Sequence, residues 1–142
     1  MIVPDVNVLL YAFRDDLPAH EDHRKWLVDR LAGEEPVALP DAVLAGFMRV
    51  VTHPRIFSPP TPPVEAAAFV EALRAAPAAV TPSLGASHID TFLGLCTRAN
   101  ARGSLVADAY LAAVAIELGA VLMTTDRDFA RFRGLRWRHP LG

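Results

Sequence analysis

Short apolar runs alternate with longer amphipathic segments along the whole chain. The runs have the length of buried strands, and Pro, Gly or charged residues bound most of them. They occupy residues 1–6, 36–40, 78–82, 120–125 and 134–138. Strands that alternate with helices run parallel and are covered on both faces. The pattern therefore predicts an α/β protein, a three-layer α/β/α sandwich around a parallel sheet of four to five strands.

The segments between these runs carry apolar residues at helical spacing. Helices are expected over residues 7–13, 20–31, 41–51, 63–73, 88–101, 104–118 and 127–132. In the second of them, Trp26, Leu27 and Leu31 mark the inward face, whereas the polar start, "HEDH" (20–23), is expected to face solvent. Prolines recur through "THPRIFSPPTPP" (52–63), so this segment is predicted to be a rigid loop.

The composition suits one globular domain over residues 1–142, with a hydrophobic fraction of 52%. The single cysteine, Cys96, excludes an internal disulfide and fits a reducing cytoplasm. The start of the chain lacks the basic residues of a secretory signal. The longest later apolar stretch, residues 106–123, contains Asp108 and Glu117. We therefore expect a cytoplasmic protein with no membrane partner.

The charge is slightly negative, −2, although the chain has thirteen Arg and one Lys. This balance excludes a globally basic nucleic-acid binder. Five of the arginines crowd the C-terminal segment, close to two acids: Arg127, Arg131, Arg133, Arg136 and Arg138. Composition alone favours a solvated charged face there, and a local basic patch is the alternative.

One acid lies where a charge is least expected. Asp5 stands in "MIVPDVNVLLYAF", among apolar residues and with no Lys or Arg in the first thirteen positions. An ionised carboxylate that leaves water costs several kcal/mol unless a partner compensates it. The position predicts a partner from elsewhere in the chain, or a metal ion.

Three further acids are expected at the same edge of the sheet as Asp5. Asp5 ends the first strand, and Asp126 and Asp128 follow the fourth. Asp108 lies early in an Ala-rich helix that runs back toward that fourth strand. If the first and fourth strands are neighbours, all four lie at a topological switch point, where open α/β sheets bind ligands. Three of the acids also have a structural explanation: Asp108 as a partner of a helix dipole, Asp126 as a helix cap and Asp128 as a surface charge.

Carboxylates gathered in this way repel each other and raise one another's pKa unless a cation separates them. An all-oxygen set with no His or Cys nearby selects a hard ion, Mg²⁺ or Mn²⁺. Such ions activate water and neutralise phosphoryl charge during in-line attack, which points to phosphodiester cleavage.

Three segments carry a family resemblance that spans nearly the whole chain: "PDVNVLLYAF", "GSLVADAYLAAVAIELGA" and "LMTTDRDFARFRGLRWRHPL". They resemble the PIN-domain ribonucleases, most of all the VapC toxins of bacterial toxin–antitoxin pairs. The resemblance implies a PIN fold and a Mg²⁺-dependent endoribonuclease that acts on RNA. It also implies a homodimer and a small cognate antitoxin of the VapB type, whose tail enters the active site.

The resemblance assigns roles to individual residues. Asp5, Asp108 and Asp126 match the metal-binding acids, and Asp128 is a catalytic accessory in the same "TTDRDF" motif. Two polar residues beside the acids match orienting positions. They are Asn7 and Thr124.

The chain departs from the family at one position. Gly46 in "VLAGFMRVV" stands where many PIN nucleases have a Glu. Asp41, earlier in the same predicted helix, is expected either to substitute in part or to stabilise the helix N-terminus. Arg49 is expected either to reach the RNA or the antitoxin, or to brace the helix. Because the chain has one acid fewer than the family pattern, we expect one well-bound metal ion and a second that is weak or absent.

Other classes that gather acids at strand ends fit less well. A phosphoacceptor receiver domain needs a Lys after a late strand, and the only Lys is Lys25, in an early helix. No Gly-x-x-x-x-Gly-Lys occurs, which excludes a P-loop NTPase. Many α/β phosphohydrolases begin with Asp-x-Asp, whereas this chain has Asp5-Val6-Asn7. The remaining alternative is a catalytically weak or inactive PIN module that binds RNA or a protein.

Overall fold

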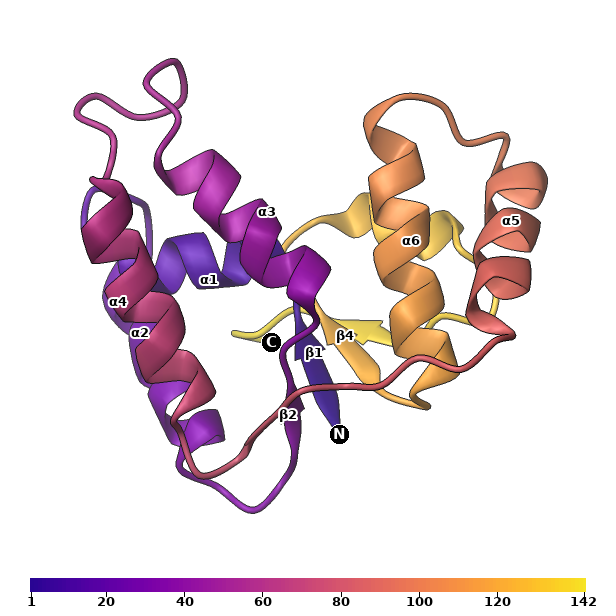
Figure 1. Ribbon diagram of the computed structural model, residues 1–142, viewed down its shortest axis with the longest axis horizontal. Coiled ribbons are helices and arrows are strands. Elements are labelled where there is room, and N and C mark those ends of the chain that lie inside the picture. Colours follow the sequence, from indigo (N-terminus) through magenta and orange to yellow (C-terminus); the bar gives the residue numbers. More distant parts are fainter.

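Five short parallel strands form one sheet in the computed structural model, which describes residues 1–142 (Figure 1). The strands are β1 (Ile2–Pro4), β2 (Val37–Ala38), β3 (Ala79–Val80), β4 (Val121–Met123) and β5 (Trp137–Arg138). Their order across the sheet is β3-β2-β1-β4-β5. All five predicted strands and their parallel pairing are confirmed, and each ladder is shorter than its apolar run.

The first and fourth strands are neighbours, as the gathering of acids requires. Ile2 pairs with Val121 and Pro4 pairs with Met123. The chain steps from β1 through β2 to β3 in one direction, then crosses back to β4 and β5 on the other side of β1. The sheet therefore has its switch point between β1 and β4, at the carboxyl ends of both strands.

Seven helical segments connect the strands. They are α1 (Val6–Phe13), α2 (His20–Leu31), α3 (Asp41–Val51), α4 (Pro63–Arg74), α5 (His88–Ala99), α6 (Ser104–Glu117) and the 3₁₀ helix η1 (Arg127–Arg131). Because parallel crossovers are right-handed, the reversal of direction places α1–α4 and α5–α6 on opposite faces. Figure 1 shows these two groups on either side of the strands. None of these helices combines the length and the hydropathy that a membrane span requires.

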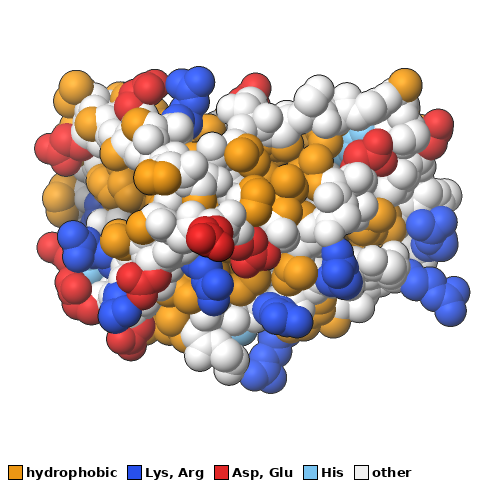
Figure 2. All heavy atoms as spheres, turned by 90° about the horizontal axis from the view of Figure 1, so that it is seen from below, with side chains coloured by type: hydrophobic (Ala, Val, Ile, Leu, Met, Phe, Trp, Pro, Cys, Tyr) orange, Lys and Arg blue, Asp and Glu red, His pale blue; other side chains and the backbone are white.

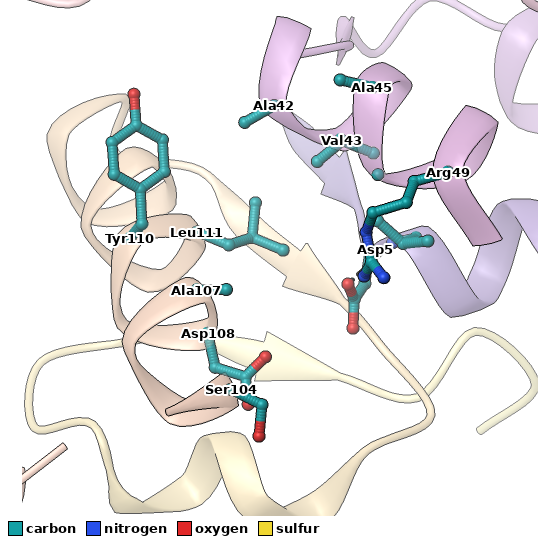
Figure 3. A pocket seen from close by; sticks show the side chains of 12 residues that line it. Asp5, Ala42, Val43, Ala45, Arg49, Ser104, Ala107, Asp108, Tyr110 and Leu111 are labelled. Atoms are coloured by element: carbon teal, nitrogen blue, oxygen red, sulfur yellow. Dashed lines mark hydrogen bonds between the residues drawn. The ribbon is translucent and has the colours of Figure 1, made fainter. Parts of the chain in front are cut away.

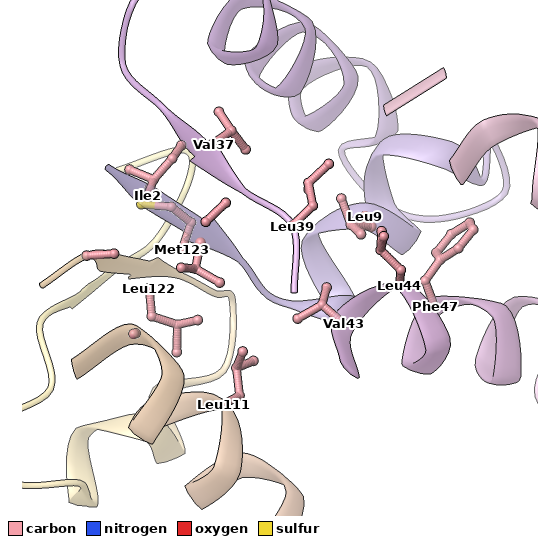
Figure 4. Packing of buried hydrophobic residues seen from close by; sticks show 14 of the residues in the cluster. Ile2, Leu9, Val37, Leu39, Val43, Leu44, Phe47, Leu111, Leu122 and Met123 are labelled. Carbon is pink, nitrogen blue, oxygen red and sulfur yellow. The ribbon is translucent and has the colours of Figure 1, made fainter. Parts of the chain in front are cut away.

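The core lies where the helices pack on the sheet. Phe47 of α3 is fully buried between Phe13 of α1 and Phe69 of α4, with ring centroids 5.6 and 5.1 Å away. Figure 4 shows side chains of α1, α3, α6 and the strands meeting in this core, with Leu9 and Leu111 among them. Burial of these large apolar groups is the main stabilising contribution to the fold.

The helix that carries Asp108 is buried over only part of its length. Leu111 and the four residues that follow it are buried, whereas Ser104, Val106 and Ala107 in the first turns are exposed. The Ala-rich composition of this helix, which on its own favours burial all round, therefore does not describe the start of α6. Asp108 lies where this helix emerges from the core, with one side toward protein and one toward solvent.

The prediction that "HEDH" faces solvent is wrong for His23. This side chain is only 3% exposed, and its ring stacks on Tyr11 at 4.9 Å between centroids. One ring nitrogen, Nδ1, lies 2.9 Å from the carbonyl oxygen of Ala19. His23 precedes Leu27 and Leu31 by four and eight residues, so it shares their inward helix face where α2 packs on α1.

The proline-rich segment 52–63 is a loop between α3 and α4, as predicted. Its inner residues are nevertheless well packed, since Phe57 and Thr61 are buried. The Arg14 guanidinium lies 4.3 Å from the centre of the Phe57 ring and donates a hydrogen bond to the carbonyl oxygen of Pro59. This arginine ties the loop to the end of α1.

Candidate active site

Asp5 joins the end of β1 to the start of α1. Its backbone N–H donates to the carbonyl oxygen of Met123, which continues the β1–β4 ladder, and its side chain caps α1. Oδ1 accepts from the backbone N–H of Val6 at 2.7 Å. An aspartate at this position satisfies one of the N–H groups that a helix start leaves unpaired.

Two polar side chains supply the rest of the hydrogen bonds to Asp5. Oδ2 accepts from the Thr124 hydroxyl at 2.7 Å and from the Asn7 side-chain amide at 2.9 Å. Thr124 is completely buried, and its oxygen also accepts from the backbone N–H of Asp126 at 3.0 Å. The Asn7 carbonyl accepts from the backbone N–H of Thr125 at 3.3 Å. Asn7 and Thr124 therefore connect the ends of β1 and β4 and hold the Asp5 carboxylate in place.

These donors compensate the Asp5 charge only in part. Burial raises the pKa of Asp5 above its ordinary value, and the nearby carboxylate of Asp126 raises it further. The hydrogen bonds from Thr124, Val6 and Asn7 lower the pKa, but the net direction is upward. The surroundings of Asp5 thus balance the negative charge of its ionised form only in part.

Asp108 on α6 is the most strongly perturbed acid. Burial raises its pKa from 3.8 to about 6, with added repulsion from Asp5, Asp126 and Asp128 and a smaller opposing effect of Arg131. Its carboxylate accepts no hydrogen bond from another side chain or backbone group. The four acids that the sequence predicts at one edge therefore lie within electrostatic reach of one another.

Asp126 and Asp128 follow β4 at the start of η1. Asp126 caps η1, since its Oδ1 accepts from the backbone N–H of Asp128 at 2.8 Å. Asp128 is exposed, and its Oδ1 lies 3.8 Å from a guanidinium nitrogen of Arg131. The structural roles expected for these two acids are thus present, together with their proximity to Asp108.

Asp5 and Asp108 line one pocket of about 520 Å³ between α3 and α6. Figure 3 shows the two carboxylates at one end of this pocket, with Arg49 extending from α3 toward Asp5. The remaining wall is mostly apolar, and Tyr110 lies at its far end. The pocket thus has an acidic end with one cation, Arg49, and an apolar end.

Gly46 and Asp41, both on α3, differ in whether they line this pocket. Gly46 lines it, and a Cβ added there would lie 2.8 Å from Cγ2 of Val6. Asp41 does not line it. This exposed residue in the first turn of α3 borders a separate pocket with Pro82 and Tyr110. The expectation that Asp41 substitutes for the missing acid is therefore wrong, because Asp41 does not line the pocket of Asp5 and Asp108.

The donor atoms of this site are of the kind that binds a metal ion, but they are not placed to coordinate one without movement. No three acidic, His or Cys side chains stand close enough together here to hold one ion. The available donors are carboxylate and amide oxygens, which hard divalent cations prefer. The raised pKa values of Asp5 and Asp108 show negative charge that the protein itself leaves unbalanced. A cation would balance it, after side-chain movement that brings the carboxylates together.

The cap that Asp5 forms on α1 is the site feature that sequence reasoning missed, whereas Asn7 and Thr124 were expected to orient the acids. A metal ion was the expected compensation, whereas Val6, Asn7 and Thr124 already donate to the carboxylate. The position of an aspartate directly before an apolar helical pattern was a usable signal for the cap. The hydrogen bond from Thr124 to Asp5 could be located only once the pairing of β1 with β4 was known.

Comparisons with known proteins find relatives over nearly the whole chain. The family model described as PIN domain matches residues 2–135. Ribonuclease VapC43 of Mycobacterium tuberculosis is 53% identical over 142 residues, covering 99% of this chain and 96% of the relative. Ribonuclease VapC25 of the same organism is 43% identical over 140 residues, covering 99% of each.

Solved structures show the same fold at much lower identity. VapBC-1 from nontypeable Haemophilus influenzae superposes with a TM-score of 0.71 and 16% identity, over 100% of both chains. VapC20 of Mycobacterium tuberculosis, described as a sarcin-ricin loop cleaving toxin, superposes with a TM-score of 0.68 and 17% identity. That match covers 96% of this chain and 99% of the other.

Proposed function

Because the chain belongs to the PIN-domain family, among its VapC ribonucleases, we propose that its four gathered aspartates form a metal-dependent endoribonuclease centre. The reaction is hydrolysis of RNA phosphodiester bonds. The observation that carries this proposal is the pocket in which Asp5 and Asp108, 103 positions apart in sequence, face each other with raised pKa values. Structural stability alone gives no reason to place two poorly compensated acids together.

The centre would hold Mg²⁺, or Mn²⁺, through Asp5, Asp108 and Asp126, with Asp128 as an accessory. The bound ion would supply Lewis acidity toward the phosphate and a lowered pKa of attacking water. Asn7 and Thr124 orient Asp5 through their hydrogen bonds. Arg49 on the pocket wall would hold a phosphate oxygen of the RNA, since a guanidinium suits bidentate phosphate contacts.

The biological role proposed is that of the toxin in a toxin–antitoxin pair. The relatives are named VapC ribonucleases, and the solved neighbours include VapBC complexes. By analogy, this chain would form a homodimer in the cytoplasm and bind a small VapB-like antitoxin. Induced expression should then arrest growth, and co-expression of the small partner should restore it.

A second candidate is a catalytically weak or inactive PIN module that binds RNA or a protein. Gly46 favours it, because no acid of α3 enters the pocket. The absence of any three side chains placed for a metal ion favours it as well. The proposed nuclease needs the carboxylates to converge on an added ion, and the binding module does not.

A cleavage assay separates the two. Purified protein with Mg²⁺ should cut a structured RNA, EDTA should stop the reaction, and Asp108→Asn should lower the rate by at least about 100-fold, as expected when a group that stabilises the transition state is lost. Glu34→Gln removes an exposed carboxylate far from the pocket and should cleave like wild type. Full activity of Asp108→Asn would refute the assignment, and no cleavage of any RNA by wild type would favour the binding module.

A further inference from the structure

Two pockets at the ends of η1 are lined by positive side chains and by no acid. One, of about 540 Å³, lies between η1 and the end of α5. The other, of about 700 Å³, lies between η1 and the C-terminal segment. The arginines that line them are Arg98, Arg131 and Arg133 in the first pocket and Arg127 and Arg138 in the second, which His139 also lines.

Most of these arginines have no carboxylate partner. Arg131 alone has one within 4 Å, on Asp128. Elsewhere on the surface, four positive side chains pair with acids, whereas Arg24, Arg55 and Arg102 do not. The four pairs are Arg14 with Asp16, Lys25 with Asp29, Arg30 with Glu35 and Arg74 with Glu71. Figure 2 shows several blue side chains at its lower right, on the side of α5, with no red ones between them.

The second pocket begins next to the acidic centre. Arg127 directly follows Asp126 in the sequence. Arg138 pairs with Met123 in the β4–β5 ladder, and its carbonyl oxygen accepts from the backbone N–H of Thr124 at 3.0 Å. Two residues of this second pocket therefore adjoin, along the backbone, the end of β4 that Asp126 follows.

We propose that Arg98, Arg127, Arg133 and Arg138, here called the arginine surface, bind the RNA backbone on one side of the cleavage site. This inference rests on the proposed nuclease function and names how its substrate is held. The centre itself carries four carboxylates and the whole chain a net charge of −2, so neither attracts a polyanion. Affinity for RNA then needs a local positive surface, because phosphate contacts dominate nucleic-acid binding.

The dimensions fit a short stretch of one strand. η1 has five residues, and at about 2 Å per residue of 3₁₀ helix it separates the two pockets by roughly 10 Å. A stacked strand carries one phosphate per about 3.4 Å, so about three nucleotides span this distance. Guanidinium groups in concave surfaces match phosphates, and an RNA cleaved at the aspartates would pass the neighbouring Arg127, whereas an acidic peptide has no such reason to bind beside the acids.

RNA binding as a function of salt tests the proposal. The probe is a fluorescein-labelled single-stranded RNA of about 20 nucleotides, and Asp108→Asn serves as the background that prevents cleavage. From a salt slope of about 0.7 per phosphate contact, each of Arg98→Gln, Arg127→Gln, Arg133→Gln and Arg138→Gln should weaken binding about fourfold at 0.15 M salt. Together they should weaken it roughly 250-fold and lower the slope by about 3.

The matched control is Arg30→Gln with Arg74→Gln, which removes two exposed arginines from the α2 and α4 side. It should leave RNA affinity within about twofold of the background, and all variants should keep the same melting temperature. Unchanged affinity and slope in the fourfold variant would overturn the proposal. So would equal losses in the control, since these would report net charge alone. A fourfold variant that binds RNA normally but no longer binds a decaglutamate peptide would overturn it in favour of an acidic protein partner.

Cleavage kinetics with Asp108 intact separate this inference from the proposed function. Arg98→Gln with Arg133→Gln should raise KM for the long RNA at least about tenfold, as two lost contacts imply, and leave kcat unchanged. A dinucleotide, too short to span the roughly 10 Å between the two pockets, should be cut by this variant as by wild type. Cleavage by wild type with normal KM in the variant would refute the arginine surface alone. Weakened RNA binding by the variant without any wild-type cleavage would refute the nuclease alone.

Discussion

Replacing Asp108 with Asn removes a charge that destabilises the folded protein when no cation is bound. Burial and the carboxylates of Asp5 and Asp126 raise the pKa of Asp108 from 3.8 to about 6. A carboxyl with a higher pKa in the folded state binds its proton more tightly there, so the protein loses stability as the pH rises between these two values. Below about pH 4 the acid is protonated in both states, and the substitution should change little.

The magnitude follows from the size of the shift. Two pKa units correspond to roughly 3 kcal/mol for a fully buried group. Asp108 is only partly buried, so solvent screening reduces the effect, and we expect Asp108→Asn to gain about 1–2 kcal/mol above about pH 6.5. For a chain of 142 residues this gain raises the melting temperature by about 5 °C.

Thermal unfolding followed by circular dichroism, in EDTA and from about pH 4 to 8, measures this difference. The stability gap between Asp108→Asn and wild type should open between about pH 4 and 6 and then stay constant. Glu34→Gln, which removes an exposed carboxylate, should show no such gap. A variant less stable than wild type above pH 6, or a gap that is the same at every pH, would refute the reasoning about charge at this site.

Three further substitutions test the packing around the site. Thr124→Val removes the hydroxyl that donates to Asp5 at 2.7 Å, so it should raise the pKa of Asp5 further and cost about 1–3 kcal/mol in urea unfolding, whereas Thr124→Ser should cost less. Equal losses in both would contradict the hydrogen bond. Gly46→Ala places a Cβ 2.8 Å from Val6 and should cost about 1–3 kcal/mol, a loss that Val6→Ala should relieve in the double variant. Simply additive losses would show that the two residues do not touch. Phe47→Ala should cost about 3–5 kcal/mol, and a loss under about 1 kcal/mol would contradict the burial of its ring.

The order of elements was predictable because their periodicity is local. Alternating apolar runs and amphipathic segments located all five strands and the helices between them. The strand lengths were not predictable, since the apolar runs continue beyond the ladders. Leu39 and Thr124, for example, are buried just past the ends of β2 and β4. Burial in these positions comes from packing of the connections, which sequence alone does not separate from strand pairing.

The candidate site was predictable as a set of acids but not as a network. Strand and helix logic places Asp5, Asp108 and Asp126 at one edge provided that β1 and β4 pair, and the structure supplies that pairing. The orientation of Asp41 depends on how α3 sits on the sheet, and the hydrogen bond from Thr124 depends on the same long-range packing. Neither the orientation of Asp41 nor the hydrogen bond from Thr124 can be predicted from the periodicity of one segment.

Binding of Mn²⁺, followed by its electron paramagnetic resonance signal in the absence of RNA, tests most directly whether the aspartates hold a divalent cation. Wild type should bind at least one ion. Asp5→Asn and Asp108→Asn should each weaken binding at least about tenfold, because each removes a charged ligand. The control, Glu34→Gln, should bind as wild type does. Affinities that are identical in wild type and in both aspartate variants, or no bound Mn²⁺ in a wild-type protein that cleaves RNA, would contradict the account.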